Sequence, residues 1–229
     1  MAKMETNENY THACNSKLTN PENYICSIAD AGYTNDEFKA IIAFYVLHAP
    51  TLKSDKSDSF GLKNLKDYGW RGNSDMNKLE RELLKASGLQ SFCFIKSSAI
   101  NNTLEQMQLG TSAWCVEHPR AVLKQDYTVT IAENGKAEIS NSETRMECLF
   151  RHLRNAFAHN HVYVFTNGNI LLEDIDGPNK IITARILVPK ISLLNWINIV
   201  KKIPSPPEER NDEKMPDILT SKDINTKSA

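Results

Sequence analysis

The sequence has no long apolar run. The longest one, Ala40 to Leu47, is far shorter than the ~20 residues that a membrane-spanning helix requires. The first residues also lack the basic and apolar regions of a secretory signal peptide. The five cysteines are odd in number, scattered and without a CxxC pair, which disfavours a disulfide framework. We therefore expect a soluble, cytoplasmic protein with reduced thiols and no membrane partner.

A net positive charge is also missing. The formal charge of the 229-residue chain is −1, so no global field marks it as a nucleic-acid-binding protein. Walker A, GxGxxG, HExxH and GxSxG motifs are absent, and with them the usual sequence signs of nucleotide, metalloprotease and serine-hydrolase sites. Contact with RNA or DNA would need a local basic patch, and we expect neither a cofactor nor a metal.

The composition does allow a real core. Hydrophobic residues make up 41% of the chain, enough for one domain with appendages or at most two domains. Residues 1–33 form a polar arm rich in Asn and Thr, and residues 34–202 carry the periodic segments of the domain. From residue 203 the chain turns into a polar tail that we expect to be disordered.

Helical periodicity and capping residues mark several segments. Thr34 and Ser140 each precede a glutamate by three residues, a capping-box pattern that predicts two helix starts. The first of these helices should stop before Pro50. The other predicted helices are one from a Ser74 or Asp75 cap to Gly88, one within 92–109, and one capped by Ser192.

Two Asn-Gly pairs predict hairpins, because this pair readily supplies the positive φ angles of a type I′ turn. The first, Asn134-Gly135, separates alternating residues between 127 and 139. The second, Asn167-Gly168, separates strands at 162–165 and 170–175. A third strand is expected from Lys180 to Val188, so this part of the chain should form a small antiparallel sheet.

The segment from Arg151 to His161 holds two arginines and three of the six histidines. It ends a predicted helix that should stop near His159, because Asn160 tolerates the left-handed conformation that follows a helix. Histidine exchanges protons near neutral pH, and the arginine guanidinium suits phosphate. Such a helix end fits phosphodiester chemistry. The apolar stripe of the same helix is Met146, Leu149, Phe150, Leu153 and Phe157.

Other interpretations of these residues stay open. Basic groups in a last turn also favour the helix macrodipole without any function. His159 and His161 could bind a metal, but no third ligand is evident. Cys148 and His152 have the spacing of a thiol–imidazole dyad but no oxyanion loop, so we interpret the cysteine as a packing residue. Asp174 to Gly177 resembles part of a calcium loop without its downstream glutamate.

The hexapeptide Arg154-Asn155-Ala156-Phe157-Ala158-His159 matches the Arg-x4-6-His signature of the HEPN superfamily of helical, mostly RNA-cleaving domains. With the strands and the Trp-containing helix that follow, residues 140–202 resemble HEPN subfamilies of bacterial plasmids and defence loci. Asn160 stands where many relatives have Gly, and His161 where toxin relatives have Tyr. The resemblance implies a mainly α fold, an antiparallel helical bundle with a small antiparallel β-sheet after the motif helix.

The resemblance also implies a function: a metal-independent endoribonuclease, as a toxin or anti-phage effector with a cognate antitoxin. Arg154 would hold the scissile phosphate of RNA, and His159 would act as general base or acid in attack by the 2′-hydroxyl. Asn155 would orient the substrate or the catalytic pair, and Arg151 would add a phosphate contact.

The spacing of the two catalytic candidates raises the question of a dimer. On an ideal helix, five residues separate Arg154 and His159 by about 140°. Either the helix end relaxes this angle, or two copies complete the site, as the resemblance implies with a homodimer. The alternative function is a non-catalytic module that uses the same helix end to bind RNA or a partner protein.

Overall fold

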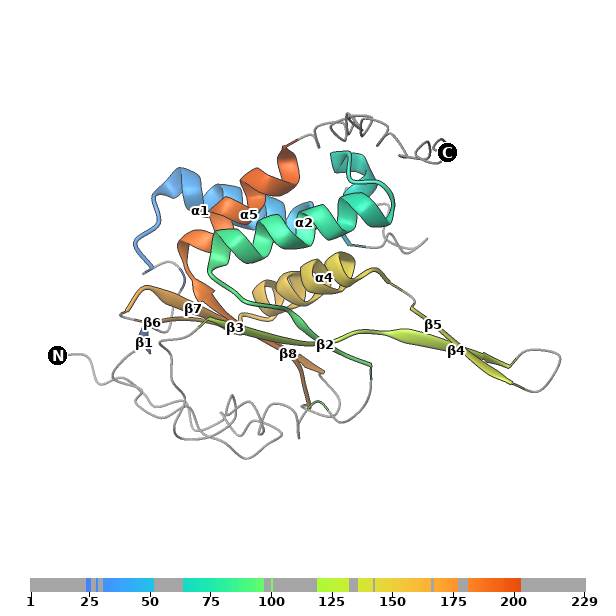
Figure 1. Cartoon of the computed structure of the whole chain (residues 1–229). Helices are drawn as coiled ribbons and strands as arrows, with labels where there is room; N and C mark the ends of the chain where they lie inside the picture. Colours follow the sequence, from blue (N-terminus) through green and yellow to red (C-terminus); the bar gives the residue numbers. More distant parts are fainter. Residues whose placement is uncertain are drawn as a thin grey trace, which may run out of the picture.

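Strands from distant parts of the chain form the main sheet of the computed structural model (Figure 1). The structure describes residues 24–25, 28, 31–51, 64–96, 100, 119–131, 136–141, 143–165, 167–176 and 181–202. Neighbouring strands run antiparallel except for the last pair, which is parallel. In spatial order the strands are β1 (Tyr24–Ile25), β6 (Val162–Phe165), β7 (Asn169–Asp176), β8 (Ile181–Pro189), β3 (Arg120–Lys124) and β2 (Cys93–Ile95).

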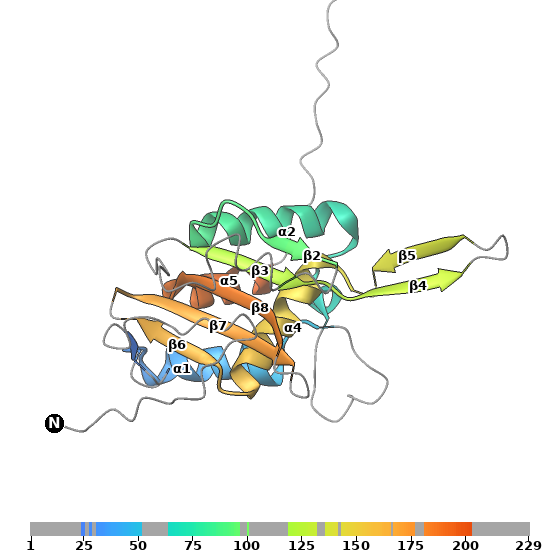
Figure 2. The same ribbon diagram turned by 90° about the horizontal axis from the view of Figure 1, so that it is seen from below.

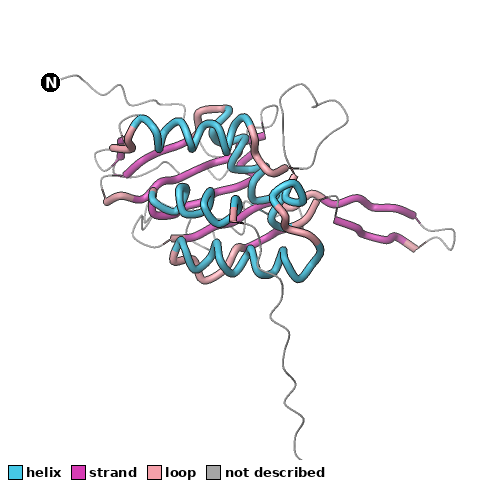
Figure 3. The backbone as a smooth tube through the Cα atoms, turned by 90° about the horizontal axis from the view of Figure 1, so that it is seen from above, coloured by secondary structure: helices cyan, strands magenta, loops and turns pink. Residues whose placement is uncertain are grey.

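The helices cover one face of this sheet. Figure 1 shows α4 nearest to the strands, and Figure 3 shows α1, α5 and α2 in a row above them. A π-helical segment, η3, continues α1, and a short 3-10 helix, η5, precedes α2. The bounds are α1 (Asn35–Ile42), η3 (Ala43–Leu47), η5 (Leu65–Tyr68), α2 (Gly72–Ser87), α4 (Arg145–Ala158) and α5 (Ile191–Lys201). No helix among these described segments is long and apolar enough to cross a membrane.

The two faces of the sheet belong to different apolar clusters. Alternate residues of β7, such as Ile170 and Leu172, join the helices in the larger cluster. Leu171 between them points the other way and belongs to a smaller cluster with Tyr163 and Leu187. Because successive side chains of a strand point to opposite faces, a strand buried on both sides has no polar alternation. The central strands β7 and β8 are therefore core elements of the domain.

The fold class predicted from the sequence, a mainly α helical bundle, is wrong. The molecule is an α/β protein in which a mixed sheet forms a full layer under the helices. Residues 92–109 were expected to be helical, but Cys93–Ile95 form β2, which pairs with β3 in parallel. The paired residues Cys93 and Val122 lie 29 residues apart in sequence, and local periodicity contains no information about such a pairing.

A second, separate hairpin projects from the body (Figure 2). Its strands are β4 (Tyr127–Ile131) and β5 (Ala137–Asn141), which pair antiparallel as predicted. Ser140 lies opposite Thr128 in this ladder, so it does not cap the following helix as predicted. The cap of α4 is Thr144, whose side chain accepts from the Glu147 amide while Glu147 bonds back to the Thr144 amide. The helix start is thus four residues later than predicted.

Some of the other predicted helix boundaries are confirmed, and others are wrong. Thr34 caps α1 with Glu37 as predicted, and Gly88 ends α2 with a φ of 67°. Two predicted caps are wrong: Arg71 precedes α2 in place of Ser74 or Asp75, and Ser192 lies buried inside the first turn of α5. The hairpin of β6 and β7 is confirmed. The Asn134-Gly135 turn, most of the 1–33 arm, most of 97–118 and the 203–229 tail lie outside the described residues.

Candidate active site

The predicted site residues lie in and directly after the second half of α4. Arg151, Arg154 and Asn155 belong to the helix, and His159 is its C-cap residue. Asn160 follows with a φ of 57°, the only positive φ of a non-glycine residue in the described part of the chain. The predicted helix end and the left-handed role of Asn160 are confirmed, and the chain then enters β6.

Apolar contacts fix this end of the helix. The predicted stripe is confirmed, since Met146, Leu149, Phe150 and Leu153 are buried in the larger cluster. In the last turn, the ring of Phe157 stacks on Tyr45 of η3, with 5.4 Å between ring centroids. The hydroxyl of Tyr45 donates to the Leu193 carbonyl at 2.8 Å, so the stacked ring is itself held in place. The last turn of α4 is thus anchored by packing just before His159.

Arg151 is fully engaged with the protein. Its Nε donates to Oε2 of Glu143 at 2.8 Å, and its Nη2 donates to Oε1 of the same carboxylate at 2.7 Å. Asp126 lies 3.3 Å from Nη2. Burial opposes ionisation of Glu143, yet the hydrogen bonds and charge of Arg151 outweigh it and lower the pKa of the carboxyl group. A phosphate contact by Arg151 would have to displace this two-pronged ion pair.

His152 holds the helix to the sheet. Only 1% of the residue is exposed, so it cannot reach a substrate. Its Nδ1 lies 2.6 Å from Oδ2 of Asp174, and its Nε2 lies 2.8 Å from the carbonyl oxygen of Lys124. Both ring nitrogens therefore meet acceptor oxygens, one on β7 and one at the end of β3. This histidine is a structural residue.

Asp174 is the residue that sequence reasoning missed. Besides His152, it accepts a hydrogen bond from Nδ2 of Asn155 at 3.0 Å. Burial would raise the pKa of this carboxyl group, but the hydrogen bonds and charge of His152, the Asn155 bond and the charge of Arg151 lower it overall. In the sequence Asp174 was visible only as part of an incomplete calcium loop. Its role follows from the packing of β7 against α4, which no local motif signals.

Asn155 connects Asp174 to Arg154. Its amide nitrogen is held by Asp174, which leaves its Oδ1 to accept from Nη1 of Arg154 at 3.5 Å, a long hydrogen bond. The three residues form a line from a buried carboxylate on β7 to a guanidinium on α4. Asn155 thus lies where it can orient Arg154.

Arg154 differs from Arg151 in having no counterion. Within the described part of the chain, no carboxylate lies at ion-pair distance from its guanidinium. Its Nε is buried and has no hydrogen-bond partner. A half-buried positive charge with an unused donor is costly in a protein, because such groups are normally paired. An anion could therefore bind Arg154 without displacing a carboxylate of the described residues.

His159 and His161 lie together beyond the helix end. Their ring centroids are 6.2 Å apart, and the rings are tilted by 34°. His159 is exposed, whereas His161 is half-buried. Burial lowers the pKa of His161; Glu173 and Asp174 oppose this effect, and His159 adds to it. Among the described residues, no group of three His, Cys, Asp or Glu side chains could hold a metal ion.

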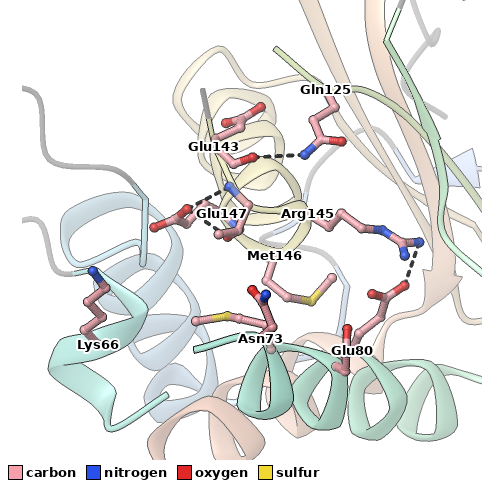
Figure 4. Close-up of a pocket in the computed structure, with 11 residues that line it drawn as sticks. Lys66, Asn73, Glu80, Gln125, Glu143, Arg145, Met146 and Glu147 are labelled. Atoms are coloured by element: carbon pink, nitrogen blue, oxygen red, sulfur yellow. Dashed lines mark hydrogen bonds and ion pairs between the residues drawn. The ribbon is translucent and has the colours of Figure 1, made fainter. Parts of the chain in front are cut away.

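The opposite end of α4 borders a polar cavity of about 610 Å³ (Figure 4). Its carboxylates serve the protein itself: Glu80 pairs with Arg145 at 2.8 Å, Glu143 with Arg151, and Glu147 with the Thr144 cap. Met146 lies between the polar groups in Figure 4, and Met76 also lines the cavity. The described residues that line the cavity include no histidine, the side chain whose ordinary pKa lies nearest to neutral pH.

Comparison with known proteins adds no relative to this picture. The chain matches no protein-family model, no curated protein and no solved structure. A function for this chain therefore has to be inferred from the geometry at the end of α4.

Proposed function

We propose that the protein is a metal-independent endoribonuclease whose site lies at the C-terminal end of α4. The observation that carries the proposal is the guanidinium of Arg154, which has no counterion among the described residues and belongs to the same helix end as His159. The neighbouring arginine of the helix, Arg151, is neutralised by Glu143. A guanidinium without a counterion and a histidine at one helix end are the two kinds of group that cleavage of a phosphodiester requires.

The chemistry follows from these groups. A histidine takes the proton of a ribose 2′-hydroxyl, and the oxygen then attacks the adjacent phosphorus. Arg154 stabilises the charge that develops on the phosphoryl oxygens, because a guanidinium keeps its proton at any working pH. The products are a 2′,3′-cyclic phosphate and a 5′-hydroxyl. The reaction needs a 2′-hydroxyl, so the substrate is RNA.

Asn155 and Arg151 support the reaction in different ways. Asn155 orients the catalytic arginine through its bonds to Asp174 and Arg154. Arg151 holds α4 to Glu143. Because it lies about one turn from Arg154 on the same helix, its positive charge adds to the attraction of a phosphate bound there. A role as a toxin or anti-phage effector, restrained by an antitoxin, rests on the sequence resemblance alone.

The decisive experiment uses labelled RNA in the presence of EDTA. We expect the wild-type protein to cleave the RNA, and Arg154→Ala and His159→Ala to lose cleavage while keeping the wild-type melting temperature. Arg145→Ala is the matched control, because Arg145 lies on the same helix, is half exposed and pairs with Glu80 away from the site. Undiminished cleavage by either site variant would refute the assignment.

The same experiment tests the alternative function, a non-catalytic module that binds RNA or a protein. That function predicts RNA retention in a filter assay without any cleavage product. Loss of retention in Arg154→Ala with no cleavage in the wild type would then support binding over catalysis.

The homodimer is a separate part of the proposal. If Arg154 of one copy works with His159 of a second copy, mixing Arg154→Ala with His159→Ala protein regenerates intact sites in the mixed dimers. Random exchange then restores about a quarter of the wild-type activity, since half the dimers are mixed and each has one intact site. A site within one chain would give no recovery.

A further inference from the structure

His161 has a fixed place between the helix and the sheet. Its amide donates to the Ala156 carbonyl at 2.8 Å, which ties it to the last turn of α4. Its own carbonyl accepts from the Glu173 amide at 3.0 Å, which ties it to β7. With both backbone groups bonded, the ring projects from a defined position next to His159.

One nitrogen of the His161 ring is buried without a partner. Its Nδ1 is buried and has no hydrogen-bond partner. In the neutral ring one nitrogen carries the proton, and Nε2 can accept a second proton only when that first one is on Nδ1. The groups around the ring are Glu173 and Asp174 on β7 and His159 at the end of α4, and burial outweighs the two carboxylates to lower the pKa. The neutral ring, with Nε2 able to accept a proton, is therefore favoured at neutral pH.

We propose that His161 is a second catalytic residue of the endoribonuclease, acting with His159 as an acid–base pair. This inference rests on the proposed function. His161 accepts the proton of the 2′-hydroxyl as the bond from O2′ to phosphorus forms. His159 donates a proton to O5′ as the bond from phosphorus to O5′ breaks. One proton enters and one leaves the histidine pair, so the step needs no other reactant.

The spacing of the rings suits this division of work. The attacking and leaving oxygens lie on opposite sides of the phosphorus, and each needs a nitrogen within about 2.6–3.2 Å. Rings with centroids 6.2 Å apart can place one nitrogen on each side of a single phosphoryl group. Arg154 is left to bind the oxygens that do not react.

The test compares two leaving groups. One substrate is a dinucleotide, in which the leaving 5′-oxygen needs a proton. The other is a nucleoside 3′-(4-nitrophenyl phosphate), whose leaving group departs without one. Both substrates carry the same nucleoside, chosen as the one of the four whose 3′-phosphodiester the wild type cleaves fastest. Rates are measured for the wild type, His159→Ala, His161→Ala and His161→Gln, after melting curves have confirmed that each variant is folded.

We expect His161→Ala and His161→Gln to lose about 100-fold in kcat on both substrates, because the base is needed in each. His159→Ala should lose about 100-fold on the dinucleotide but stay within about threefold of the wild type on the nitrophenyl ester. Wild-type rates in both His161 variants would overturn the proposal. So would the reverse pattern, in which His159 is needed for both substrates and His161 for the dinucleotide alone.

A pH profile gives an independent readout. In the wild type, kcat/KM should fall below about pH 6.5 as His161 becomes protonated, with an apparent pKa below that of a free histidine. This acid limb should disappear in His161→Gln, and an unchanged limb would contradict the assignment. Failure of the inference differs from failure of the function: if Arg154→Ala and His159→Ala abolish cleavage but His161 variants do not, the endoribonuclease stands without His161.

Discussion

Arg151 and Arg154 lie about one turn apart on the same helix, yet the protein treats them in opposite ways. Arg151 has a bidentate carboxylate partner, and its surroundings also include Asp126 and Asp174. Among the described residues, the guanidinium of Arg154 has only a long hydrogen bond to Asn155. The difference separates a charge that is neutralised within the fold from one that could bind an anion from outside the chain.

The largest effect that separates the two arginines is catalytic. Arg154→Ala should reduce RNA cleavage by about 100- to 1,000-fold, the usual loss when a group that stabilises transition-state charge is removed. The free energy of unfolding should change by less than about 0.5 kcal/mol, because no ion pair is broken. Single-turnover cleavage and urea unfolding measure the two quantities. If Arg154→Ala lost stability but kept its activity, the contrast drawn between Arg151 and Arg154 would be wrong.

The matching change at the paired site should act on stability. Arg151→Ala leaves the buried carboxylate of Glu143 without its partner, which costs about 2–4 kcal/mol in the free energy of unfolding. The low end applies because Arg151 is partly exposed. Urea unfolding measures it, with Arg145→Ala expected to cost less, about 1 kcal/mol, because the Arg145 side chain is half exposed. In Arg151→Ala/Glu143→Gln part of the loss should return, since no orphan charge remains.

Asn155 links Arg154, which has no counterion among the described residues, to the buried carboxylate of Asp174. Asn155→Ala removes the amide between Asp174 and Arg154, so the guanidinium loses its orienting contact but keeps its charge. We expect about a tenfold fall in kcat, smaller than the loss from removing the charge itself. Cleavage assays on the dinucleotide measure it. Full activity in this variant would mean that Asp174 does not position Arg154.

Acid should lower the free energy of unfolding through the two paired carboxylates, Glu143 and Asp174. The pKa values of Glu143 and Asp174 are lowered in the folded protein, so the stability they add is present above their unfolded pKa values, near 4, and is lost as the pH falls through the folded values. At any one pH the effect is smaller than in Arg151→Ala, because a protonated carboxyl keeps some hydrogen bonds. Unfolding followed from pH 6 to pH 2 should show a shallower slope in Glu143→Gln.

The sequence predicted the parts of this site that depend on local geometry. Arg154 and His159 share a helix end because helical periodicity and Asn160 mark where that helix stops. Asp174 could not be predicted, since it reaches Asn155 only through packing of β7 on α4. The same limit explains the wrong fold class. The parallel pairing of β2 with β3 leaves no periodic signal in a three-residue strand.

Competing local signals account for the misplaced helix start. Ser140 with Glu143 and Thr144 with Glu147 both have capping-box spacing. Only the second forms, because Ser140 is held in the β4–β5 ladder and Glu143 is held by Arg151. The capping box is a local motif, and tertiary contacts decide which of two copies is used.

The smallest predicted effect concerns Asn160, the residue that lies between His159 and His161 and turns the chain from α4 into β6. Asn160 has a φ of 57°, a conformation that suits Gly and Asn but disfavours other residues. Asn160→Gly should keep the melting temperature within about 2 °C, while Asn160→Ala should cost about 1 kcal/mol, the strain of one left-handed residue. Both variants keep every side chain of the site. A loss of cleavage in Asn160→Ala alone, measured at a temperature where it is folded, would show that the turn sets the positions of His159 and His161. Equal activity in both would show that the helix end and strand β6 hold the histidines without it.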